Sequence, residues 1–308
     1  MRIVLGLALL LSVAAVNAQS TPAAPAPRAG PPTINVNVRL VNVFVNVADA
    51  NGAPVAGLAK EDFLLSEDGR PQKISVFERE SELPLNIVLA IDASGSVRKD
   101  FGIEEMAARH FVHATLRPVD RLDIMEFADN VREVVRFTNN LPRIDRALND
   151  IRAGAATALY SGVYLAAQNL APYSGRKVLL LISDGSNTVK GTTYDMALEQ
   201  AVRGEVIVYS IIDVPIAASA GRDLAGEHAM ITLSQETGGK YYYADASSLD
   251  KIFAQVSEEL RTQYLLGYYP QNHSNDGNFR RISVRLSRPP AATDYSVRSR
   301  TGYYPSSN

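Results

Sequence analysis

The apolar residues of this chain change their spacing twice, and this change constrains the fold more than any other feature. Between residues 33 and 80 they alternate with a period of two, as they do from Val41 to Val47, which is typical of strands with one buried face. From residue 83 to 260, short apolar runs alternate with segments of helical spacing. After residue 262 the strand pattern returns, so the chain has a β-α-β-type middle between two β ends.

Strands that alternate with helices predict a mainly parallel sheet with helices on both faces. The strands at each end of the chain are too few to form a stable domain alone, so we expect the two sets to pair. The predicted fold class is α/β, with a doubly wound, Rossmann-like domain inserted in a β-sandwich-like domain. The expected boundaries are residues 83–260 for the α/β domain and residues 33–80 with 262–305 for the β domain.

Residues 1–18 have the three regions of a secretory signal peptide. Arg2 supplies a positive charge, residues 3–16 are apolar, and Val16-Asn17-Ala18 provides small residues for cleavage. The apolar run is shorter than the roughly 18–20 residues of a spanning helix, so a membrane anchor is the weaker alternative. Residues 19–32 are rich in Pro, Ala and Ser, as in a flexible linker. We expect a periplasmic or secreted protein whose mature chain has no membrane span.

The composition excludes several classes of site. The 308 residues contain no cysteine, which excludes disulfides, thiolate metal sites and thiol nucleophiles. The formal net charge is −2 and the basic residues are scattered, so nucleic acid is not an expected partner. Any metal site must therefore use oxygen or imidazole ligands.

Five oxygen-bearing side chains occur where strands of the predicted sheet end. Asp92, Ser94 and Ser96 alternate along the turn after the first apolar strand of the α/β domain, and Asp184 follows a later strand. Thr157 stands at the start of a predicted helix after a loop of small residues. Because ligands of open α/β sheets bind at the carboxyl ends of the strands, we expect these three loops to converge.

Two carboxylates with three hydroxyls suit a hard divalent cation, Mg²⁺ or Mn²⁺, which prefers oxygen ligands. Protein-bound Mg²⁺ usually keeps water molecules as ligands, and an Asp or Glu carboxylate of a protein partner could replace one of them. The expected chemistry is metal-bridged protein binding.

These residues resemble the von Willebrand factor type A (VWA) family over about residues 83–260. The metal-ion-dependent adhesion site (MIDAS) of that family has the pattern Asp-x-Ser-x-Ser, then a distant Thr, then an Asp, and this chain fills all five positions. The resemblance implies a VWA fold, a metal held by these residues, and a role in adhesion. Ala155-Ala156 departs from the Gly-rich step often found before the Thr. The flanking chain looks like a bacterial exported VWA-related family, through Glu67-Asp68-Gly69 and the Gly-Tyr-Tyr-Pro repeats at 267–270 and 302–305.

Three alternatives remain. Asp92 and the two serines could merely cap a helix, although this leaves Thr157 and Asp184 unexplained. The site could be intact but unused in an envelope scaffold, or its metal could serve a hydrolase. The sequence lacks the usual motifs of serine hydrolases, zinc proteases and P-loop enzymes, so we predict no enzymatic activity. The spacing of His110 and His113 could suit a metal, but His110 falls on the apolar stripe and is predicted to pack in the core.

Overall fold

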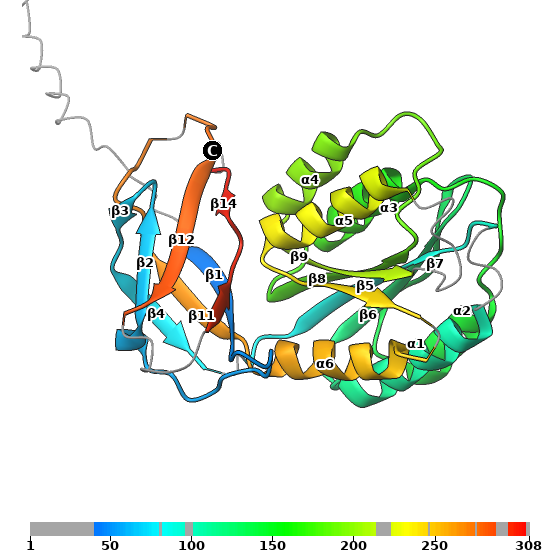
Figure 1. Ribbon diagram of the computed structural model, residues 1–308, viewed down its shortest axis with the longest axis horizontal. Helices are drawn as coiled ribbons and strands as arrows, with labels where there is room; N and C mark the ends of the chain where they lie inside the picture. The colour runs from blue at the N-terminus through cyan, green and yellow to red at the C-terminus, as the bar shows by residue number, and fades with distance from the viewer. Residues whose placement is uncertain are drawn as a thin grey trace, which may run out of the picture. The chain divides into compact units, whose positions relative to one another are not determined.

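A mainly parallel sheet forms the centre of the α/β part of the chain (Figure 1). The computed structural model describes residues 40–79, 82–95, 101–213, 223–245, 247–274, 276–287 and 295–305. Within these residues the sheet has six strands in the order β10-β9-β8-β5-β6-β7, and β7 is antiparallel to its neighbour while the others are parallel. The strands are β5 (Leu85–Asp92), β6 (Arg121–Phe127), β7 (Val131–Thr138), β8 (Arg176–Ser183), β9 (Val206–Asp213) and β10 (Tyr241–Ala244).

Helices cover both faces of this sheet, as Figure 1 shows. On one face lie α1 (Phe101–Thr115), α2 (Leu141–Asn149) and α6 (Leu249–Arg261), and on the other lie α3 (Leu159–Leu170), α4 (Tyr194–Arg203) and α5 (Leu224–Thr237). Each set of helices packs against its own apolar core, and every residue of β5 is buried between the two cores. The prediction of a doubly wound α/β fold is confirmed. Among the described residues, no helix has the length and apolar character needed to cross a bilayer.

Two helix starts differ from the sequence prediction. Thr157 does not open a helix, because α3 begins at Leu159 with Ala158 as its N-cap. For α6, the spacing of Ser247 and Asp250 in the sequence predicts a capping box, but none forms, since the N-cap is Ser248 and its side chain makes no capping bond. Instead, the Ser248 hydroxyl accepts a hydrogen bond from the Asp245 amide at 2.9 Å. These short polar side chains bind loop backbone as readily as a helix end.

The strands of the two chain ends pair with each other, as the fold prediction requires. Within the described residues they form two four-stranded sheets, β13-β1-β11-β4 and β14-β12-β2-β3, and all their pairs are antiparallel. A shared apolar core lies between the sheets. Residues 38–308 form one compact unit. The boundaries between the α/β domain and the β domain therefore stay a prediction. The elements are β1 (Val41–Ala48), a 3-10 turn (Lys60–Asp62), β2 (Phe63–Glu67), β3 (Arg70–Pro71), β4 (Ile74–Glu78), β11 (Tyr264–Tyr268), β12 (Arg280–Leu286), β13 (Ser296–Arg298) and β14 (Gly302–Tyr303).

A buried carboxylate joins the two Gly-Tyr-Tyr-Pro repeats inside the sandwich. Glu67 is 2% exposed, and its Oε2 accepts hydrogen bonds from the hydroxyls of Tyr268 at 2.7 Å and Tyr303 at 2.9 Å. Arg280, also buried, lies 3.5 Å from Oε1 and donates to the carbonyls of Asn272 and Ser274. The first tyrosine of each repeat therefore serves the structure of the sandwich.

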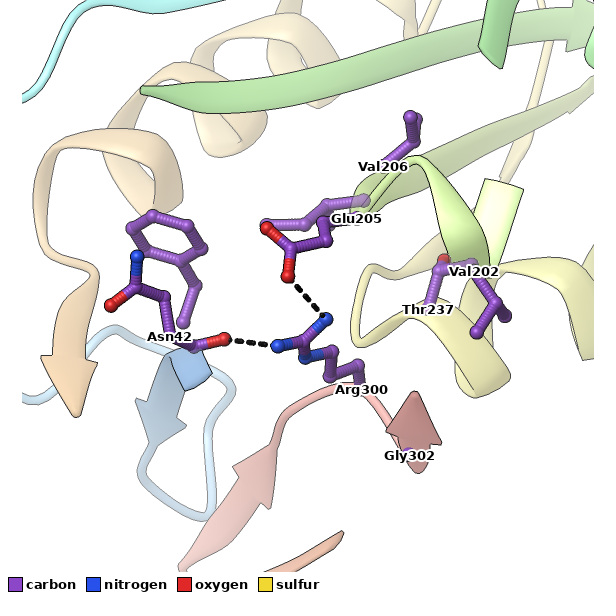
Figure 2. A pocket seen from close by; sticks show the side chains of 9 residues that line it. Asn42, Val202, Glu205, Val206, Thr237, Arg300 and Gly302 are labelled. Carbon is purple, nitrogen blue, oxygen red and sulfur yellow. Dashed lines mark hydrogen bonds and ion pairs between the residues drawn. The ribbon is translucent and has the colours of Figure 1, made fainter. Parts of the chain in front are cut away.

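Two arginines near the end of the chain join the sandwich to the α/β part. Arg298 pairs with Glu259 of α6 at 2.7 Å. Figure 2 shows Arg300 between the carboxylate of Glu205, at 3.3 Å, and the backbone carbonyl of Asn42, at 2.5 Å. Because Glu205 precedes β9, this pocket lies at the amino ends of the strands, on the edge opposite to the predicted metal site.

Candidate metal site at the carboxyl edge of the sheet

The predicted ligands lie at the topological switch point of the sheet. The chain continues from β5 to β6 on one side, and later returns as β8 on the other side of β5. Asp92 is the last residue of β5, and Asp184 directly follows β8. Since β5 and β8 are parallel neighbours, both carboxylates stand at the same edge, in the crevice where open α/β sheets bind ligands.

Asp92 is a fully buried acid, with 0% of its surface exposed. Its Oδ2 accepts a hydrogen bond from the Ser183 hydroxyl at 2.5 Å, and its Oδ1 accepts one from the Ser94 amide at 2.9 Å. Burial, together with the charge of Asp184, raises the pKa of Asp92 to about 6, against the lowering effect of these hydrogen bonds. Within the described residues, none of the groups acting on this carboxyl is cationic.

Backbone hydrogen bonds tie the loops of this edge together. The Ala93 amide donates to the Phe127 carbonyl at the end of β6 at 3.0 Å, and the Gly154 amide donates to the Ala93 carbonyl at 2.8 Å. The loop before α3 therefore lies directly against the loop after β5. Thr157, at 3% exposed, is the residue of that loop predicted to be a ligand.

The Thr157 backbone is bound in turn to the loop after β8. Its amide donates to the Thr188 hydroxyl at 2.8 Å, and its carbonyl accepts from the amides of Thr188 at 2.9 Å and Val189 at 3.1 Å. The loops of Asp92, Thr157 and Asp184 thus form one bonded assembly.

Glycine allows the first turn of α5 to approach the Asp184 loop. Gly185 has a φ of 91°, in the region that favours glycine, and a Cβ added at Gly226 would lie 1.7 Å from the Gly185 carbonyl oxygen. The N-cap Asp223 holds this turn by accepting the amides of Ala225 and Gly226 at 3.1 and 3.0 Å. No larger residue fits at Gly226 without moving the loop that carries Asp184.

The structure brings four of the five predicted side chains to this edge. Ser94 is buried just after β5, and Asp184 is half-buried with its Oδ1 accepting the Ser186 amide at 2.9 Å. Ser96 lies outside the described residues. Sequence reasoning missed Ser183, which binds Asp92 directly. No sequence signal separates Ser183 from the other small residues beside Asp184.

The donors suit a divalent cation. A buried carboxylate that meets only neutral donors and a second acid is costly to ionise, and a cation beside it would remove that cost. Among the described residues, no group of three or more His, Cys, Asp or Glu side chains could hold a metal ion. The predicted ligand set contains only two carboxylates, and its other donors are Ser and Thr hydroxyls, so it is not a group of that type.

The histidine pair does not pack in the core, which corrects the sequence prediction. His110 is exposed on α1, and its Nδ1 lies 3.1 Å from Asp250. His113 lies 3.1 Å from Asp145, also on the surface. The helix therefore turns His110 away from the apolar stripe, toward the groove between α1 and α6.

Comparison with known proteins agrees with this geometry. A model of the von Willebrand factor type A domain family matches residues 87–187, from β5 to the loop after β8. The α/β part has the VWA fold, and its residues 87–187 match the model of that family. A search of curated proteins finds no match for the chain.

Solved structures of low identity are similar to this chain. A von Willebrand factor type A protein from Catenulispora acidiphila is 10% identical, with 86% of this chain and 74% of that chain covered and a TM-score of 0.50. Proximal thread matrix protein 1 from the mussel byssus, solved with zinc in its MIDAS motif, is 15% identical, with 64% and 50% covered and a TM-score of 0.52. An aerotolerance-related membrane protein from Bacteroides fragilis is 19% identical, with 57% and 98% covered and a TM-score of 0.46.

Proposed function

We propose that the protein is a metal-dependent protein-binding module and not an enzyme. Asp92, Ser94, Ser96, Thr157 and Asp184 would hold one divalent cation, directly or through water. The observation that carries the proposal is the buried Asp92 carboxylate at the switch point, bonded to loops that also present Thr157 and Asp184. A structural scaffold that never uses the ion is the alternative to test.

The ion we propose is Mg²⁺ or Mn²⁺, because all five donors are oxygens. The mussel protein solved with zinc in its MIDAS motif supports a divalent ion at the corresponding place in a VWA fold. When bound, the ion supplies a positive charge and an exchangeable position for one oxygen ligand. The role of this chain is to present the ion at the open edge of a rigid sheet.

The partner we propose is a protein that offers an Asp or Glu side chain. Its carboxylate would enter the exchangeable position, so that binding depends on both metal and acid. We further propose that this takes place outside the cytoplasm, periplasmic or secreted, on the strength of the signal-like residues 1–18. Residues 1–39 lie outside the described part of the chain.

Calorimetric titration with Mg²⁺ and Mn²⁺ tests the metal site. We expect binding of one ion to the wild type and none to Asp92→Ala. Asp150→Ala is the matched control, because that exposed acid pairs with Arg132 and Arg152 and is not among the five proposed ligands. A wild type that binds neither ion at millimolar concentration would show that the assignment is wrong.

Capture of partners from an envelope extract, with and without chelator, separates the binding module from the scaffold. Asp184→Asn and Thr157→Ala should reduce metal-dependent capture more than they reduce thermal stability, because both residues lie in loops. Capture that persists in chelator, or falls only in parallel with stability, would favour the scaffold.

A further inference from the structure

The loop that carries Thr157 has no regular secondary structure, since residues 151–158 lie between α2 and α3. Its conformation must therefore come from contacts with its neighbours. Two side chains outside the Asp-x-Ser-x-Ser…Thr…Asp pattern make such contacts, one from each side of the loop.

Asp129 holds the loop from the side of β6. Its Oδ2 accepts the Ala155 amide at 2.9 Å and its Oδ1 accepts the Ala156 amide at 3.2 Å. The contact is close, because a Cβ added at Gly154 would lie 2.4 Å from Asp129 Oδ2 and 2.5 Å from the Ala128 Cβ. One carboxylate thus binds the amides of the two residues that precede Thr157.

Thr188 holds Thr157 from the side of β8. Its hydroxyl oxygen accepts the Thr157 amide at 2.8 Å, and its own amide donates to the Thr157 carbonyl at 2.9 Å. One residue therefore binds both polar backbone groups of Thr157. Thr188 lies just beyond the family match, which ends at residue 187.

We propose that Asp129 and Thr188 are positioning residues that clamp the Thr157 loop in its metal-binding conformation and thereby set the affinity for the divalent ion. The inference rests on the proposed function. A loop that is ordered before binding loses less conformational entropy when the ion arrives. Side chains that orient metal ligands typically change metal affinity by about 10- to 100-fold when they are replaced.

Asp129→Asn and Thr188→Val test the clamp. Asn keeps the shape of Asp but can accept only one of the two amides, and Val keeps the shape of Thr but lacks the acceptor oxygen. We expect Mg²⁺ to bind each variant about 10- to 100-fold more weakly in calorimetry, with the melting temperature of the metal-free protein close to that of the wild type. Thr188→Ser restores the hydroxyl and should restore most of the affinity.

Two substitutions outside the site are matched controls. Asp49 Oδ1 accepts the amides of Asn51 and Ala53, both at 2.9 Å, in a turn of the sandwich. Thr138 Oγ1 accepts the Asn140 amide at 3.1 Å before α2. Asp49→Asn and Thr138→Val should leave Mg²⁺ affinity unchanged.

The outcomes separate the clamp from the proposed function. If the wild type binds Mg²⁺ and both clamp variants bind equally well, or if the controls weaken binding as much, the clamp is overturned and the metal site stands. If melting temperatures fall while affinity holds, Asp129 and Thr188 serve folding alone and the clamp is again overturned. A wild type that does not bind Mg²⁺ overturns both.

Discussion

Glu67 in the sandwich and Asp92 in the α/β part are both buried acids, but their surroundings differ. Glu67 accepts bonds from two tyrosine hydroxyls and lies beside the buried guanidinium of Arg280. Asp92 accepts bonds from serine and backbone groups, and the neighbouring charge is another acid, Asp184. One acid has its cation within the chain, and the other has none among the described residues.

This difference distinguishes an acid that serves folding from one suited to a ligand. A buried ion pair with all its hydrogen bonds formed fixes the arrangement of the strands around it. A buried acid without a cationic neighbour is costly to the fold, and such costs concentrate at functional sites. We therefore expect substitutions at Glu67 to affect stability, and substitutions around Asp92 to affect stability mainly through metal.

Removal of the Glu67 carboxylate should have the largest effect. Glu67→Ala leaves Arg280 buried without its acid, and loss of one partner of a buried ion pair typically costs about 3–5 kcal/mol of unfolding free energy. Urea denaturation without metal measures this loss. Glu78→Ala, at an exposed position of β4 in the same sandwich, should change stability by less than about 0.5 kcal/mol. Equal effects of the two substitutions would contradict the role of Glu67.

Metal should stabilise the protein through Asp92 and not through Glu67. Binding to the native state alone adds about 2.7 kcal/mol at a hundredfold excess of ligand over Kd. Thermal unfolding with and without Mg²⁺ should show this gain in the wild type and not in Asp92→Ala. Glu67→Ala should keep the gain at a temperature where it is folded, and a loss there would mean that the two regions are not independent.

Removal of one hydroxyl donor from each acid sharpens the comparison. Tyr268→Phe and Ser183→Ala each delete a hydrogen bond to a buried carboxyl, which is worth about 1.5–3 kcal/mol when the acceptor is charged. Both should lower stability in denaturant titrations. Only Ser183→Ala should also weaken Mg²⁺ binding, by about 10-fold or more. Weaker Mg²⁺ binding by Tyr268→Phe would show that the surroundings of Glu67 also affect the metal site.

The sequence predicted the elements whose pattern is local or repeated. Apolar β5 and β8 predicted the parallel strands, and Asp92 and Ser94 lie at the carboxyl end of β5, where the pattern predicts them. Ser96, outside the described residues, stays a prediction. Pairing of the two chain ends followed from counting strands. These inferences succeed because buried strands of parallel sheets are continuous apolar runs that end at a common edge.

The contacts around these donors could not be predicted from the sequence. Asp129 accepts the amides of Ala155 and Ala156 at separations of 26 and 27 residues, and Thr188 accepts the Thr157 amide at a separation of 31 residues. Their partners are backbone groups, which carry no residue-specific signal. Likewise, apolar spacing predicts the direction of a side chain around the helix axis only roughly. It therefore predicts a core position for His110, which lies on the surface.

Asp123 is a third buried acid, and it differs from Glu67 and Asp92 because it keeps its proton at neutral pH. Its effect on stability should therefore depend on pH. Asp123 lies in β6 with 0% exposed, and its Oδ2 is 3.5 Å from the Asn169 side chain. Burial, together with the hydrogen bond and charge of Glu133, raises the pKa of Asp123 to about 8, against the lowering effects of Asn169 and Arg136. This acid therefore needs no cation at neutral pH, because it keeps its proton.

The sign of the pH effect follows from that raised pKa. The folded protein holds the Asp123 proton more tightly than the unfolded chain does, so stability falls as pH rises from about 4 to about 8. The slope is at most about 1.4 kcal/mol per pH unit. Asp123→Asn cannot titrate, and its unfolding free energy should fall less steeply than that of the wild type between pH 6.5 and 7.5, in denaturant titrations without metal.

Asp120 is the control for this prediction, since it lies three residues away and its pKa shifts in the opposite direction. Burial alone would raise the pKa of Asp120, but hydrogen bonds from Arg117 and the Leu85 amide lower it below its usual range. Asp120 therefore titrates at acid pH, and Asp120→Asn should keep the wild-type slope between pH 6.5 and 7.5. If Asp123→Asn also keeps that slope, Asp123 is ionised in the folded protein, beside Glu133 and with Arg136 as the cation that acts on it.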